Sequence, residues 1–115
     1  MRRVLVVQNQ KHIARLIQTT LERSGQEVRV VETGSEGLHL LQTEKFDQAI
    51  VDYTMSHPNG YELLEFIRTN DETRMMSVVL MVNSPSQYDH VQSLPFRADV
   101  HTDPRQNPFR KDRKR

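Results

Sequence analysis

The chain has 115 residues, of which 36% are hydrophobic and 27% charged, and its formal net charge is +1. This length indicates one domain with a single buried core, and no apolar run approaches the roughly 18 residues that cross a bilayer. Cysteine is absent, which excludes disulfides, thiolate nucleophiles and zinc–thiolate sites. The apolar segment behind Met1-Arg2-Arg3 is too short for a signal peptide, so we expect a cytoplasmic protein with no membrane contact.

The first half of the chain alternates predicted strands with predicted helices. Residues 4–7 form a continuous apolar, β-branched run, which is typical of a strand buried on both faces. Four apolar residues then share one face of a predicted helix: Ile13, Leu16, Ile17 and Leu21. Gly25 is expected to cap that helix, and residues 27–31 predict a second strand. Ser35 opens a shorter helix, weakened by Gly37, before a third predicted strand over 46–51.

The second half continues the same alternation with weaker signals. Apolar spacing predicts a helix over 61–68, and an apolar run predicts a strand over 77–82. Ser84 and Pro85 are typical of a helix start, here opening a poor helix over 85–94. Residues 98–101 predict a short fifth strand.

Strands that alternate with helices indicate right-handed βαβ units and a parallel sheet. Ligands of such sheets bind outside the carboxyl ends of the strands. We expect four strand ends to converge there: Gln8-Asn9, Asp52, Val82-Asn83 and Thr102-Asp103.

The C-terminal segment differs in charge from the rest of the chain. Residues 105–115 carry six basic residues against one aspartate, a net +5, so the remainder carries −4. We therefore divide the chain into a domain over 1–104 and a basic tail or linker over 105–115. A second interpretation makes the tail an electrostatic contact for nucleic acid, acidic protein or anionic lipid.

Several segments together resemble the receiver domain of two-component response regulators. They are VLVVQNQ, VETGSEGL, VDYTMSHPNG, VVLMVNS and the DP at 103–104, and the similarity runs from about residue 3 to residue 104. The resemblance implies a three-layer α/β/α fold of the flavodoxin-like (CheY-like) kind, with a five-stranded parallel sheet. Its fifth helix is expected to be weak or missing, because the tail lacks an apolar stripe.

The resemblance also implies a set of site residues. A receiver domain takes a phosphoryl group on an aspartate, here Asp52, with Mg²⁺ held by that aspartate and an acidic pair after the first strand. A Thr or Ser on the fourth strand and a Lys on the fifth bind the phosphoryl oxygens, and an aromatic residue reports the switch.

This sequence departs from that set at most positions. Gln8 and Asn9 replace the acidic pair, and Val82 replaces the hydroxyl residue. Asp103 stands at the lysine position and Val100 at the aromatic switch position. Mg²⁺ rarely binds without carboxylates or phosphates, so Asp52 beside two amides predicts at most a weak metal site.

A pocket of this composition has two physical outcomes. If Asp52 and Asp103 both point into it, they repel and one shares a proton with the other. Alternatively Lys11, His12 or His101 supplies the missing cation.

The sequence therefore favours a non-enzymatic, phosphorylation-independent receiver that needs no cofactor. We expect signalling proteins as its partners, with a homodimer as one option and nucleic acid not expected. Two alternatives stay open: a phosphoacceptor that is modified at Asp52 with Mg²⁺, and a regulator that contacts nucleic acid through residues 105–115.

Overall fold

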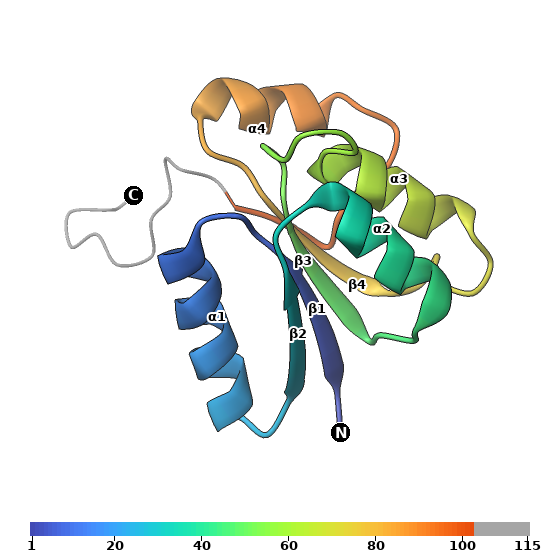
Figure 1. Cartoon of the computed structure of the whole chain (residues 1–115). Helices are drawn as coiled ribbons and strands as arrows, with labels where there is room; N and C mark the ends of the chain where they lie inside the picture. Colours follow the sequence, from blue (N-terminus) through green and yellow to red (C-terminus); the bar gives the residue numbers. More distant parts are fainter. Residues whose placement is uncertain (103–115) are drawn as a thin grey trace.

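A parallel sheet with helices on both faces forms the molecule (Figure 1). The computed structural model describes residues 1–102, except for the side chain of His101. The strands are β1 (Arg3–Val7), β2 (Glu27–Val31), β3 (Gln48–Asp52), β4 (Ser77–Met81) and β5 (Val100–His101). The helices are α1 (Lys11–Arg23), α2 (Gly34–Thr43), α3 (Gly60–Thr69) and α4 (Pro85–Gln92).

The strand order is β2-β1-β3-β4-β5. The chain therefore goes from β1 to β2 on one side, and then crosses back to place β3, β4 and β5 on the other side of β1. The first four strands have five residues each, whereas β5 has two. This is the α/β fold that the alternating pattern and the family resemblance predict. The expected weak or missing fifth helix, like the basic tail, lies outside the described residues.

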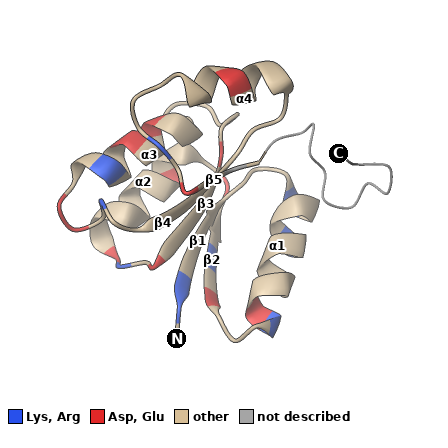
Figure 2. Ribbon diagram, turned by 180° about the vertical axis from the view of Figure 1, so that it is seen from behind, with Lys and Arg blue, Asp and Glu red and all other residues tan. Residues whose placement is uncertain are grey.

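The two faces of the sheet carry cores of different size. On one face, strand residues such as Leu5, Val51 and Leu80 pack with buried residues of α2 and α3. The other face carries a smaller cluster around Val4, Val6 and Val28, which α1 covers. Between their end residues the strands β1, β3 and β4 carry no charged side chain, whereas Arg29 lies in the middle of the edge strand β2 (Figure 2).

The start and end signals of the helices are confirmed at several positions. Gly25 has φ +84° and follows the end of α1, as expected of a glycine that ends a helix. Ser84 accepts a hydrogen bond from the Gln87 N–H with Pro85 in the first turn of α4. Two further caps were not predicted: Thr33 forms a capping box at the start of α2, where Ser35 was expected to open the helix, and Asn59 forms one at the start of α3.

Some predicted boundaries and one predicted core residue were wrong. Leu16 is 68% exposed, because Ala14, Ile17 and Leu21 supply the face of α1 that meets the sheet. β3 begins at Gln48 rather than residue 46 and includes Asp52. Asp47 precedes β3, and its carboxylate accepts a hydrogen bond from the Arg3 N–H. In a longer strand a backbone carbonyl would accept that hydrogen bond.

Other boundaries differ by one or two residues. α2 begins at Gly34, α3 covers Gly60–Thr69, α4 stops at Gln92, and β4 ends at Met81. β5 starts at Val100 instead of residue 98. Within residues 1–102, no helix combines the length and apolar character that a membrane crossing requires.

Candidate functional site

Asp52 is the last residue of β3 and is buried, with 2% of its surface exposed. β3 lies between β1 and β4, and Asp52 is in register with Met81 of β4. The chain then turns back on itself, and the Gly60 N–H donates to the Tyr53 carbonyl at 3.3 Å. A Cβ on Gly60 would lie 2.5 Å from the Asp52 carbonyl oxygen, so the turn closes this tightly only around a glycine.

Neutral groups donate to the Asp52 carboxylate, and all of them reach one oxygen. Thr54 donates to Oδ1 through both its backbone N–H and its hydroxyl, each at 2.9 Å. Asn83 Nδ2 lies 3.5 Å from the same oxygen and donates to Thr54 Oγ1 at 2.8 Å. Among the described residues, Oδ2 receives no hydrogen bond.

Of the two amides expected at the acidic-pair positions, only Gln8 lies inside the site. It is 1% exposed, whereas Asn9 is exposed. Gln8 Oε1 accepts the Gln10 N–H at 2.9 Å, and Nε2 lies 3.9 Å from Met81 Sδ. Its carbonyl oxygen is therefore engaged in ordering the turn into α1.

Of the candidate substitute cations, Lys11 and His12 do not pair with Asp52. None of the described Lys, Arg or His side chains forms an ion pair with this carboxylate. Lys11 lines an open cavity of about 450 Å³ beside Gln8, together with Arg15 and Glu32. His12 is exposed on α1. Asp103 and the His101 side chain are not among the residues that the structure describes. The repulsion expected between Asp52 and Asp103 therefore stays a prediction.

The hydroxyl and switch positions lie on β4 and β5. Val82 is 5% exposed and offers only its backbone, whose N–H donates to Thr102 Oγ1 at 2.9 Å. Val100 is in register with Val79 and is half exposed. Val82 therefore brings an apolar side chain to the edge where Asp52 and Gln8 lie.

Comparison with known proteins decides the family. Residues 4–101 match the response regulator receiver domain family, most of the chain. The chain belongs to this family. The transcriptional regulatory protein GltR of Pseudomonas aeruginosa is 30% identical to this receiver domain over 98 residues, which are 85% of the chain and 40% of GltR. The alkaline phosphatase synthesis transcriptional regulatory protein PhoP of Bacillus subtilis gives the same identity and coverage. The chain thus spans about two fifths of the length of these relatives.

Solved structures agree with the fold of this receiver domain. The receiver domain of a Francisella response regulator has a TM-score of 0.77 and 26% identity, covering 91% of this chain and 85% of its own. The receiver domain of a signal transduction histidine kinase from Syntrophus aciditrophicus has a TM-score of 0.81 and 25% identity, covering 90% of this chain and 79% of its own.

The receiver family implies Mg²⁺, and the donor set among the described residues does not fit it. In residues 1–102, apart from the His101 side chain, no group of three or more His, Asp or Glu could hold a metal. The side-chain oxygen of Gln8 already accepts a hydrogen bond from the Gln10 N–H, and Asn9 lies at the surface. A single carboxylate with neutral neighbours is a poor site for a hard divalent cation.

Three polar residues of the site of this receiver domain were missed or left unassigned by sequence reasoning. Thr54 follows Asp52 by two positions, a spacing at which an Asp side chain bonds its own chain in a turn. Asn83 and Thr102 stood among the converging strand ends without a role. Their side-chain contacts depend on how two loops lie relative to each other in space. The spacing of residues along the chain does not predict that arrangement.

Proposed function

We propose that this receiver domain is a phosphorylation-independent docking module of a bacterial signalling or regulatory pathway. One observation carries the proposal: the described groups that hydrogen-bond to Asp52 are all neutral. Oδ1 accepts from a hydroxyl and from amide N–H groups, and no described cation pairs with the carboxylate. Val82 offers no side-chain donor beside it.

Phosphoryl transfer depends on cations around the acceptor carboxylate, and no described cation pairs with Asp52. The transferred group is positioned by cations and stabilised by donors aimed at its equatorial oxygens. Removing one such preorganised donor typically lowers a rate by about 10²–10³. The rate losses caused by removing groups that act together are not additive. Each missing group nevertheless favours an Asp52 that does not accept a phosphoryl group.

The proposed partners are signalling proteins, and a homodimer of this chain is a second option. We propose no enzymatic activity and no cofactor. The relatives GltR and PhoP are named as transcriptional regulatory proteins, which supports a regulatory context. A partner would set the state of the domain by binding one conformation better than another, since only differential affinity shifts such an equilibrium.

A mass measurement tests the proposal directly. The chain is incubated with a small-molecule phosphoryl donor and Mg²⁺, and its intact mass is compared with that of Asp52→Asn. We expect no gain of a phosphoryl group in either protein at any metal concentration. A gain in the wild type that is absent from Asp52→Asn would overturn the proposal.

A second function is favoured by one specific contact pattern. Asp52 Oδ2 receives no hydrogen bond from the described residues, because every donor reaches Oδ1. A carboxylate oxygen without a donor is the one available to attack a phosphoryl donor. The same mass measurement separates this phosphoacceptor function from the docking function.

A further inference from the structure

Side chains join the loop after β3 to the loop after β4. Asn83 Nδ2 donates to Thr54 Oγ1 at 2.8 Å, and the Thr54 hydroxyl donates in turn to Asp52 Oδ1 at 2.9 Å. Asn83 also approaches Asp52 Oδ1 directly, at 3.5 Å. One hydroxyl accepts from Asn83 and donates to Asp52, so the three side chains form a consistent network, here called the Asp52–Thr54–Asn83 link.

The link continues into α4 through the backbone of Asn83. Its N–H donates to Gln87 Oε1 at 2.8 Å, while the Gln87 N–H donates to Ser84 Oγ at 3.2 Å. The first of these bonds attaches the Asn83 backbone to Gln87 in the first turn of α4, and the second caps that turn. A continuous series of hydrogen bonds thus runs from the buried carboxylate to the start of a helix on the surface.

The link differs in kind from an apolar contact. Val82 lies next to Asn83 and is buried, but its side chain has no polar group for Asp52. Asn83 and Thr54 are exposed, whereas Asp52 is not. The hydrogen bonds therefore tie two surface loops to one buried charge, and a negatively charged acceptor strengthens such bonds.

We propose that Asn83 couples Asp52 to α4 and holds the start of this helix in one position without a phosphoryl group. The inference rests on the proposed function, because it supplies the means by which an unmodified receiver domain presents a fixed α4 surface. Asn83 acts as a positioning residue: it transmits the state of the Asp52 carboxylate to Gln87 and Ser84.

A double-mutant cycle read by amide hydrogen exchange tests the coupling. The four proteins are the wild type, Asn83→Ala, Asp52→Ala and the double variant, all without a phosphoryl donor. We expect Asn83→Ala to accelerate exchange at the Gln87 and Tyr88 amides at least tenfold, with the amides of α1 unchanged. In the Asp52→Ala background the same substitution should add less than twofold, because the carboxylate that orients both the Thr54 hydroxyl and the Asn83 amide is already gone.

Two further variants complete the test. His90→Ala, an exposed change on the same helix, should leave exchange at the start of α4 unchanged, and Thr54→Val should reproduce part of the effect of Asn83→Ala. Equal acceleration by Asn83→Ala in both backgrounds would overturn the coupling, because Asn83 would then support α4 without Asp52. Uptake of a phosphoryl group at Asp52 would overturn the proposed function and leave this cycle intact, so the two failures are distinguishable.

Discussion

At the scale of single residues, Gly60 packs closely against the backbone of Asp52. A Cβ on Gly60 would lie 2.7 Å from the Asp52 carbonyl carbon and 2.8 Å from Leu80 Cδ1, in addition to the carbonyl oxygen. The side chain of Leu80 can yield, but the backbone of a central strand cannot. Glycine at this position is therefore a requirement of packing, since its backbone is not in the left-handed region.

We expect Gly60→Ala to lower the free energy of unfolding by about 1–3 kcal/mol, as overpacking of a filled interior usually does. Urea unfolding at neutral pH measures it. Gly25→Asn is the matched control: Gly25 has φ +84°, which asparagine tolerates, and nothing lies within 4 Å of a Cβ there. If Gly60→Ala proved as stable as the control, the tight turn after Asp52 would not constrain the site.

The position of Asp52 was predictable from the sequence, whereas its partners were not. An apolar strand that ends in a carboxylate places that carboxylate at the carboxyl edge of a parallel sheet, and the structure has it there. Asn9 was expected beside Asp52 and is exposed instead, because the turn into α1 directs only Gln8 inward. Hydrogen bonds between two loops, such as Asn83 to Thr54, depend on loop geometry that no periodicity encodes.

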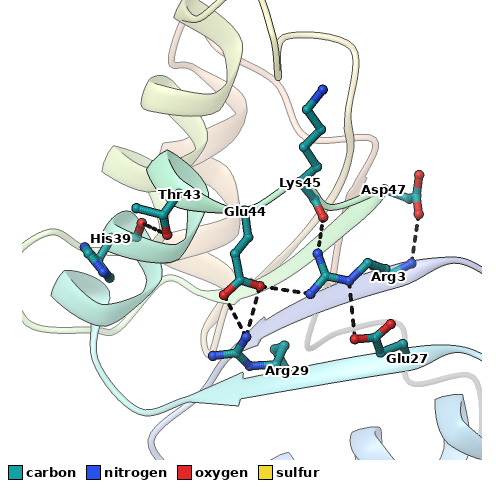
Figure 3. A network of polar contacts seen from close by, with 8 residues as sticks. All are labelled: Arg3, Glu27, Arg29, His39, Thr43, Glu44, Lys45 and Asp47. Carbon is teal, nitrogen blue, oxygen red and sulfur yellow. Dashed lines mark hydrogen bonds and ion pairs between the residues drawn. The ribbon is translucent and has the colours of Figure 1, made fainter.

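At the scale of elements, a charged network joins the first residue of β1 and the middle residue of β2 to the segment after α2 (Figure 3). Glu44 accepts from Arg3 Nη2 at 2.9 Å and from Arg29 Nη1 at 2.8 Å. The Arg3 guanidinium also donates to the Lys45 carbonyl and lies 4.8 Å from the centre of the Phe46 ring. The network holds the α2–β3 connection against the sheet at the end opposite Asp52.

This network predicts a dependence of stability on pH. The hydrogen bond from Arg3, and then that from Arg29, lowers the pKa of Glu44 below its ordinary value of 4.5. Because the folded-state pKa is the lower one, the stabilisation is complete above pH 4.5 and is lost as the pH falls through the folded-state value. Urea unfolding between pH 7 and pH 3 should show Glu44→Gln less stable than the wild type at neutral pH.

The difference in unfolding free energy between the wild type and Glu44→Gln should become smaller as the pH is lowered. Glu65→Gln is the control, since Glu65 is exposed on α3 and belongs to none of the ion pairs found in residues 1–102. A difference that stayed constant down to pH 3 would contradict a role for the Glu44 charge.

The fifth strand shows why some elements are harder to predict than others. The pattern over 98–101 predicts four strand residues, but β5 has two. The Asp99 N–H donates to the Val78 carbonyl at 2.9 Å, yet the Val78 N–H is taken by the Asp99 carboxylate at 2.7 Å. Arg68 pairs with that carboxylate at 3.2 Å. A side chain thus replaces the backbone acceptor, which shortens the strand in a way that apolar patterning does not reveal.

At the scale of the whole molecule, opposite charges are separated along the chain. Residues 105–115 carry +5 and the remainder −4. The division at residue 104 and the role of the tail as a linker stay predictions from composition.

Truncation after Pro104 separates the interpretations of the tail. If residues 105–115 are a linker, their removal should change the free energy of unfolding by less than about 0.5 kcal/mol, as changes away from a packed core usually do.

We also expect neither the full chain nor the truncated chain to bind duplex DNA at physiological salt, measured by fluorescence anisotropy. Phosphate contacts would reveal themselves through salt, because log K falls with log salt by about 0.9 for each phosphate neutralised. Binding that persists at physiological salt, falls steeply with added salt and vanishes on truncation would instead assign the tail to nucleic acid.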